Sequence, residues 1–330
     1  MHLDRITSSF INKLSSTDSK PLYEMEITEA RNFLADIQRA SKIDIDTIVF
    51  NEYIETDNGK IELQFVRPTG SENEILPVIL YVHGGGWILG DFETHSTLIK
   101  KLANCTHSCV VFVNYSRSPE AQYPQALEEI YLSLNYIYEN SKNFNINPYK
   151  IIIAGDSAGG NMAAATCIRS QKEQGPKIAF QLLLYPVTDA SMKTESYKLF
   201  KDEPWLTKKA MELFWDAYLP EKKERESIYL SLNNADIADL ENLPPALIIT
   251  AENDVLRDEG EEYARKLDEA GVDVISVRIN NTHHDFMMLN ALSESLPVKV
   301  AFYLVCSVLN CKLNAFFDDA LASPVSSIVA

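Results

Sequence analysis

Apolar residues along this chain gather in short runs, and longer stretches with helical spacing separate the runs. Six of the runs are almost continuously apolar, as strands buried on both faces of a parallel sheet are. They cover residues 78–82, 109–114, 150–154, 180–185, 246–251 and 272–279. Helical stretches at 125–140, 160–174 and 259–270 provide the crossovers that parallel strands need.

Two earlier runs, at residues 47–55 and 60–67, alternate between apolar and polar positions. Asp57, Asn58 and Gly59 lie between them and form a strong hairpin signal, because Asn and Gly tolerate positive φ. We expect these two strands to be antiparallel. Together the eight runs predict an α/β protein with a mostly parallel eight-stranded sheet flanked by helices.

Two regions, residues 1–41 and 190–240, do not fit this alternation and have the pattern of amphipathic helices. The second follows the sixth strand, and loops at the carboxyl ends of parallel strands build binding sites. We therefore expect a helical cap over the site. The predicted division is 1–44 for the N-terminal part of the cap, 45–189 and 241–311 for the two parts of the catalytic core, 190–240 for the cap insertion, and 312–330 for a tail of unassigned structure.

Composition and charge exclude several classes of protein. With 46% hydrophobic and 23% charged residues, the chain is too apolar for intrinsic disorder. Its net charge of −17 disfavours nucleic acid and anionic membrane surfaces as partners. Residues 1–20 lack the layout of a signal peptide, and no apolar run approaches membrane-spanning length. We therefore expect a cytoplasmic protein without stable membrane insertion, and a homodimer stays open.

The five cysteines are odd in number, and none of their spacings is typical of a metal site. They are Cys105, Cys109, Cys167, Cys306 and Cys311, and most lie in apolar segments. We expect reduced, buried thiols and no bound metal.

The most specific motif is Gly155-Asp156-Ser157-Ala158-Gly159, which follows an apolar strand and opens a helix. It has the G-x-S-x-G form of a nucleophile elbow, in which a sharp turn exposes the serine hydroxyl. Side chains at either glycine would clash with neighbouring backbone. The alternative is a glycine-rich turn whose serine only caps the helix.

Upstream, a strand ends in His83-Gly84-Gly85-Gly86-Trp87. This matches the HGGG loop that supplies backbone N–H groups to an oxyanion hole. We assign Gly85, Gly86 and Ala158 as the donors, and His83 and Gly84 as loop support. The triglycine could instead cradle a phosphate, but no lysine follows at P-loop spacing.

The two motifs together resemble the hormone-sensitive lipase family of esterases, in its GDSAG branch, over residues 44–311. The segment from Tyr115 to Glu120 is similar to the family's Y-R-L-A-P-E, with its arginine shifted to position 117. The resemblance implies the α/β-hydrolase fold and hydrolysis of esters with short acyl chains.

The acid and the histidine should follow the serine in the chain, each after a later strand. The segment from Asp254 to Asp258 is similar to the family's D-x-L-R-D, which implies Asp254 as the acid. Asp258 and Glu261 have the spacing of a helix capping box, so we assign them a structural role. His284 fits the family's His-x-Phe, with Asp285 at the variable position, and His283 is then structural.

The sequence gives weaker evidence for a functional role of other residues near these motifs. We expect Asp156 to anchor loops by hydrogen bonds, and Trp87 and Tyr185 to line the substrate pocket or support it. His2, His95 and His107 have no partners that the sequence identifies. The predicted chemistry needs no cofactor, because a serine, a histidine and an acid suffice for acyl transfer.

The sequence therefore predicts a carboxylic ester hydrolase with Ser157 as nucleophile, His284 as general base and Asp254 as the acid that orients it. Its partner is a small-molecule ester. An amidase or a deacetylase of a small acetylated metabolite would use the same groups. A non-catalytic ligand receptor is a further alternative, because the plant gibberellin receptors resemble this family and have lost the histidine, which is present here.

Overall fold

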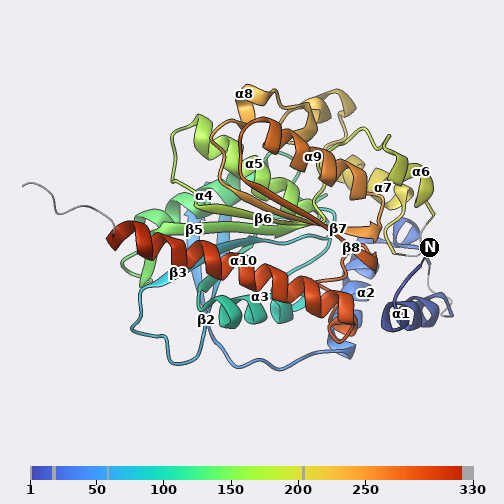
Figure 1. The fold of residues 1–330 in the computed structure, drawn as a ribbon. Helices are drawn as coiled ribbons and strands as arrows, with labels where there is room; N and C mark the ends of the chain where they lie inside the picture. The colour runs from blue at the N-terminus through green and yellow to red at the C-terminus, as the bar shows by residue number, and fades with distance from the viewer. Residues whose placement is uncertain (1, 17–19, 58, 203–204, 322–330) are drawn as a thin grey trace, which may run out of the picture.

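The predicted eight strands form one sheet in the computed structural model (Figure 1). The structure describes all residues except 1, 17–19, 58, 203–204 and 322–330, and it leaves the side chains of 314–321 undescribed. The strands are β1 Ile48–Thr56, β2 Gly59–Arg67, β3 Leu76–Val82, β4 Cys109–Asn114, β5 Ile146–Asp156, β6 Phe180–Leu184, β7 Ala246–Asn253 and β8 Val274–His283. Their order is β1-β2-β4-β3-β5-β6-β7-β8. This confirms the predicted fold class.

The hairpin prediction is also confirmed. β1 pairs with β2 antiparallel, with Thr56 opposite Gly59 across the turn. β2 pairs antiparallel with β4, and every later pairing in the sheet is parallel. The carboxyl ends of β3, β5, β6 and β7 therefore meet at one edge of the sheet.

Helices cover both faces of the sheet, as Figure 1 shows. One layer contains α4 Gln125–Glu139, α5 Ala158–Lys172 and α9 Arg257–Glu269, and the other contains α3 Phe92–Thr106 and α10 Leu296–Leu321. The remaining helices are α1 Arg5–Ser15, α2 Ile27–Ala40, α6 Glu195–Leu199, α7 Lys208–Tyr218 and α8 Ile237–Leu240, with short 3₁₀ helices at Leu22–Glu24, Lys222–Glu226, Leu232–Asn234 and Asn290–Leu292. Figure 1 places α1, α2, α6 and α7 together at the end of the sheet near β7 and β8.

The prediction of a capping box at Asp258 and Glu261 is wrong. The helix begins at Arg257 without a side-chain cap, so Asp258 already lies in its first turn. Asp258 instead accepts a hydrogen bond from the Ser196 amide at 2.7 Å. Glu261 pairs with Arg278 of β8 at 2.6 Å. Both carboxylates therefore bind partners from other segments of the chain, which the sequence spacing does not reveal.

The expectation of uniformly reduced thiols is also wrong. Cys105 of α3 and Cys306 of α10 form a disulfide, and their Cα atoms lie 5.9 Å apart although 201 residues separate them in the chain. Cys109 and Cys167 are free and buried, whereas Cys311 is free and exposed. Disulfides are uncommon in reducing compartments, so this bond weighs against the cytoplasmic location, which stays a prediction.

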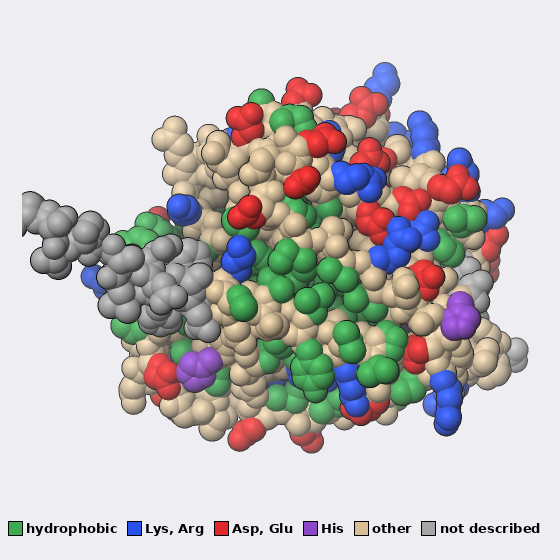
Figure 2. Space-filling model, in the orientation of Figure 1, with side chains coloured by type: hydrophobic (Ala, Val, Ile, Leu, Met, Phe, Trp, Pro, Cys, Tyr) green, Lys and Arg blue, Asp and Glu red, His purple; other side chains and the backbone are tan. Residues whose placement is uncertain are grey.

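Helix α10 corrects the expectation about apolar length and resolves part of the unassigned tail. Its window Leu296–Leu313 has a mean hydropathy of 1.5, which by length and composition would allow a membrane span. Ala301, Val305 and Leu309 are fully buried, on the side of the helix that packs on α3 and β8. Apolar side chains on its outer face are exposed, Leu296 and Tyr303 among them. Figure 2 shows apolar side chains gathered on the face of the molecule where this helix lies. A helix that packs on a sheet with one face can have the same length and mean hydropathy as a membrane span. The hydropathy of α10 is therefore weak evidence for a membrane span.

Candidate active site

The turn between β5 and α5 holds Ser157 in a strained conformation. Its φ of 53° and ψ of −122° lie outside the regions that L-residues favour. The flanking glycines make the turn possible, because a Cβ at Gly155 would lie 2.4 Å from the Gly159 carbonyl oxygen. A Cβ at Gly159 would lie 2.1 Å from the carbonyl oxygen of Val82. The serine hydroxyl is thereby presented at the carboxyl edge of the sheet.

Ser157, His284 and Asp254 form one continuous hydrogen-bonded chain from three separate strand ends. His284 Nε2 lies 2.8 Å from Ser157 Oγ, and its Nδ1 lies 2.7 Å from Asp254 Oδ2. The second oxygen of Asp254 accepts the amide of Leu256 at 3.0 Å, which fixes the carboxylate. All three side chains are buried. In this geometry Nε2 can take the proton of the serine hydroxyl while the carboxylate holds the other ring nitrogen.

The electrostatic surroundings favour a positive charge on His284. Burial alone would lower its pKa, but the carboxylates of Asp254 and Asp285 outweigh burial and raise the pKa to about 9. The ring of Tyr185 meets His284 edge to face, with the centroids 5.0 Å apart. Tyr185 itself is fully buried, and burial raises its pKa well above the usual value.

His283 has a different environment from its neighbour. Its Nδ1 lies 2.5 Å from the backbone oxygen of His284, and its ring stacks on Phe10 of α1 with the centroids 6.2 Å apart. Burial lowers its pKa to about 4, so the ring is neutral at pH 7. It forms no hydrogen bond with Ser157 among the described residues.

The loop after β3 presents backbone amides next to Ser157. Within the described residues, the N–H groups of Gly85, Gly86 and Ala158 donate to no protein acceptor. Gly85 and Gly86 have φ values of 102° and 61°, which favour glycine. A Cβ on Gly86 would lie 2.3 Å from the Phe214 ring of α7, so the insertion packs directly on this loop. Free, oriented amides of this kind can donate hydrogen bonds to an anionic oxygen.

Asp156 ties this loop to the elbow. Its Oδ1 accepts from the Tyr81 hydroxyl at 2.7 Å and from the Gly84 amide at 3.0 Å. Its Oδ2 lies 3.3 Å from Nε2 of His95 in α3. Burial would raise the pKa of this carboxyl, but the His95 charge and hydrogen bond lower it, and Asp156 in turn raises the pKa of His95 against the effect of burial. The sequence revealed no partner for His95, because α3 brings it to Asp156 only in the fold.

His83 and Trp87 both support the loop through packing with other elements. The Nδ1 of His83 lies 2.8 Å from the Gly84 oxygen, and burial lowers the pKa of His83 to about 3. Its ring stacks on Tyr115 with the centroids 4.1 Å apart. Trp87 is fully buried, and its ring centroid lies 4.5 Å from those of Trp215 and Tyr218 in α7. Neither residue contacts Ser157 through a hydrogen bond in the part of the chain described here.

Helix α2 anchors the two loops that the site uses, a role that the sequence did not reveal. Arg31 donates to the Ile88 carbonyl at 2.9 Å and forms two 2.7 Å bonds with Glu120. Gln38, which is buried, donates to the Met288 carbonyl at 3.0 Å and accepts from the Asn290 amide at 2.9 Å. The N-terminal region thus holds both the glycine loop and the segment after His284.

A family model described as the alpha/beta hydrolase fold matches residues 79–288, which contain the glycine loop, Ser157, Asp254 and His284. The chain belongs to the alpha/beta hydrolase family. Among its relatives is an esterase of Gibberella moniliformis, which is 33% identical over 269 residues, 81% of this chain and 83% of the relative.

Solved structures place the hydrolase among esterases as well. A thermostable esterase from Pseudomonas putida ECU1011 is 42% identical and has a TM-score of 0.92, with 94% of this chain and 98% of that chain covered. A fungal esterase from Rhizomucor miehei is 38% identical with a TM-score of 0.87, covering 96% and 98% of the two chains. The hydrolase is therefore a serine ester hydrolase. The predicted α/β-hydrolase family is confirmed, and membership in the GDSAG branch stays a prediction.

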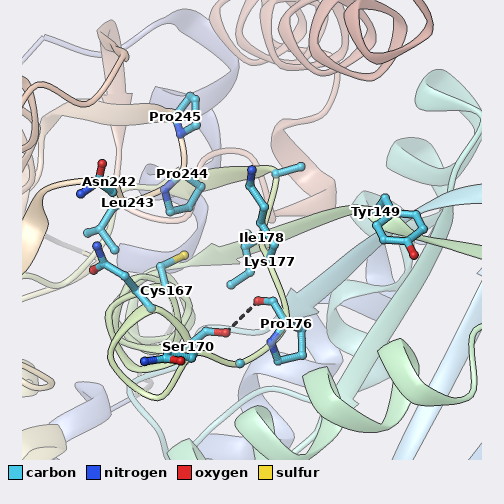
Figure 3. A pocket seen from close by; sticks show the side chains of 14 residues that line it. Tyr149, Cys167, Ser170, Pro176, Lys177, Ile178, Asn242, Leu243, Pro244 and Pro245 are labelled. Atoms are coloured by element: carbon cyan, nitrogen blue, oxygen red, sulfur yellow. Dashed lines mark hydrogen bonds between the residues drawn. The ribbon is translucent and has the colours of Figure 1, made fainter. Parts of the chain in front are cut away.

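A separate cavity of about 890 Å³ lies at the opposite, amino edge of the sheet (Figure 3). It opens between the end of α5 and the loops that precede β6 and β7, and Cys167, Pro176 and Leu243 are among its lining residues. None of the candidate residues lines it. Among the described residues no group of His, Cys, Asp and Glu could hold a metal ion.

Proposed function

We propose that this hydrolase cleaves carboxylic esters with short acyl chains through an acyl-enzyme on Ser157, with His284 as general base and Asp254 as the orienting acid. The observation that carries the proposal is the unbroken chain of contacts from Ser157 Oγ to His284 at 2.8 Å and from His284 to Asp254 at 2.7 Å. A ligand receptor of the same fold would have no need for this base beside the serine.

In the first half-reaction, Ser157 Oγ attacks the ester carbonyl while His284 Nε2 takes its proton. The carbonyl oxygen becomes an oxyanion, and the amides of Gly85, Gly86 and Ala158 are the donors that we assign to it. Each such donor typically lowers the barrier by about 2.7 to 4 kcal/mol. His284 then protonates the departing alcohol. In the second half-reaction it activates a water molecule, which releases the acid and restores Ser157.

Residues 190–240 and the N-terminal helices α1 and α2 form the cap in this proposal. Aromatic side chains of α7 support this, because Phe214 packs on Gly86 while Trp215 and Tyr218 enclose Trp87. In this proposal these aromatic side chains limit the length of acyl chain that fits beyond the oxyanion loop. The family resemblance supports the same limit on acyl length.

A p-nitrophenyl ester series from acetate to dodecanoate tests the proposed substrate range. We expect kcat/KM to peak at acetate to butanoate and to fall by roughly tenfold or more at dodecanoate, because the proposed cap would exclude the added methylenes. Assays below the micelle concentration of each ester control for substrate aggregation. A maximum at decanoate or dodecanoate would contradict the short-acyl assignment.

The pH dependence of kcat/KM should report the raised pKa of His284. The base must be neutral, so activity rises with pH through the His284 pKa of about 9. Burial opposes this raised pKa, while Asp254, Asp285 and Asp156 support it. The Tyr185 ring packs edge to face on the imidazole. We expect the acid limb measured with p-nitrophenyl acetate, after subtraction of spontaneous hydrolysis, to have its midpoint well above an ordinary histidine pKa of about 6.5. A midpoint at or below that value would show that the carboxylates do not raise the pKa.

A further inference from the structure

One carboxylate oxygen of Asp285 has no hydrogen-bond donor in the part of the chain that the structure describes. The residue follows His284 with a φ of 62°, in the left-handed region that Asp and Gly tolerate. Its Oδ2 accepts a hydrogen bond from the Trp205 indole at 2.9 Å. Its Oδ1 is buried and has no hydrogen-bond partner among the described residues. The side chain belongs to a residue that is only 9% exposed.

This oxygen lies within the candidate active site, where it pairs with the His284 ring when that ring is protonated and has no donor when the ring is the neutral base. It is 3.3 Å from His284 Nε2, the nitrogen that also contacts Ser157 Oγ at 2.8 Å. A buried acceptor without a donor is costly, so natural proteins leave one mainly where a ligand or water supplies the donor. Trp205, which comes from the insertion, prevents the carboxylate from turning Oδ1 away, because the indole N–H holds Oδ2.

The position of Oδ1 identifies the part of the substrate that it faces. In the proposed reaction the oxyanion points to the amides of Gly85, Gly86 and Ala158. The leaving alcohol oxygen must lie within reach of Nε2, because His284 protonates it. A group beside Nε2 is therefore beside the alcohol part of the ester and away from the acyl chain.

We propose that Asp285 is a specificity-determining residue whose Oδ1 accepts a hydrogen bond from an O–H or N–H donor on the alcohol part of the substrate. The preferred esters carry a hydroxyl or a protonated amine close to the ester oxygen, as monoacyl esters of diols and polyols do. This inference rests on the proposed function of Ser157 and His284, and it narrows the substrate class of that same site.

The test compares two matched esters that differ in one donor, 2-hydroxyethyl acetate and 2-methoxyethyl acetate. We expect the wild type to favour the hydroxyl ester in kcat/KM. In Asp285→Asn the amide oxygen accepts from the Trp205 indole, so the amide nitrogen occupies the place of Oδ1 and can no longer accept. The ratio of the two kcat/KM values should then fall by roughly tenfold to a hundredfold, because a hydrogen bond to a charged group is lost.

Two further variants make the outcome decisive. Asp285→Gly suits the positive φ and removes the acceptor, so it should lower the ratio as the asparagine does. Asp202→Asn removes the same charge from an exposed position in the insertion, where the side chain is 75% exposed, and should leave the ratio unchanged. A ratio near unity in the wild type, or one that persists in both Asp285 variants, would overturn the inference.

The result also separates this inference from the proposed function. Ser157→Ala is assayed beside these variants with p-nitrophenyl acetate. If that variant loses turnover and the Asp285 variants keep the hydroxyl preference, only the role of Asp285 is wrong. If Ser157→Ala retains turnover, the proposed function itself is wrong and the substrate inference falls with it.

Discussion

Replacing Ser157 by alanine should abolish ester hydrolysis and leave the fold intact. The expected loss in kcat is a factor of about 10⁶, because a triad without its nucleophile has no acyl-enzyme route. Stability should not fall, since the Ser157 hydroxyl contacts only His284 among the described residues and the strain at a φ of 53° is the same for alanine. The measurement is kcat for p-nitrophenyl acetate, with thermal unfolding recorded on the same samples.

A buried serine outside the site provides the matched control. Ser133 of α4 donates to the Glu129 carbonyl at 2.6 Å and lies in the helical layer. Ser133→Ala should keep kcat within about threefold of the wild type and change stability by no more than about 1 to 2 kcal/mol. Turnover in Ser157→Ala near the level of this control would remove Ser157 from the mechanism.

The two adjacent histidines should respond very differently to substitution. His284→Ala removes the base that contacts Ser157 Oγ, so we expect kcat to fall by about 10⁴-fold to 10⁶-fold. His283→Ala removes a stacked ring on Phe10 and should lower the free energy of unfolding by about 1 to 3 kcal/mol, with kcat close to that of the wild type.

The pair of variants is its own control, because both remove one buried imidazole from consecutive positions. Steady-state kcat and chemical denaturation of each variant give the two quantities to compare. A larger loss of kcat in His283→Ala than in His284→Ala would show that the general base is the other ring.

Local sequence patterns predicted much of the fold and of the candidate site. The apolar runs predicted the number of strands, the hairpin at Gly59 and the helical layers, because each of these depends on spacing within one segment. They did not predict the order of the strands in the sheet. The G-x-S-x-G turn was informative for a steric reason. Only glycine fits at Gly155 and Gly159, where a Cβ would meet backbone atoms.

Contacts between distant segments escaped the sequence analysis. The Cys105–Cys306 disulfide depends on α3 packing against α10, and no cysteine spacing encodes that packing. The ion pair between His95 and Asp156 depends on the same layer of helices. The contact between Trp205 and Asp285 joins the insertion to the loop after β8, so only the three-dimensional arrangement could reveal it.

The capping box at Asp258 failed for a related reason. Its spacing was correct for a cap, but the start of the helix at Arg257 placed Asp258 one position inside the first turn. A cap depends on the residue at which the helix begins, and sequence patterns locate that residue only to within a few positions.

Covalent labelling of Ser157 tests the central claim most directly. The hydrolase is treated with the organophosphate diethyl p-nitrophenyl phosphate, and its intact mass and tryptic peptides are measured by mass spectrometry. The account predicts complete inactivation with one diethylphosphoryl group per chain, located on Ser157, and no label on Ser157→Ala. Inactivation with the label on another residue, or full activity with Ser157 labelled, would contradict it.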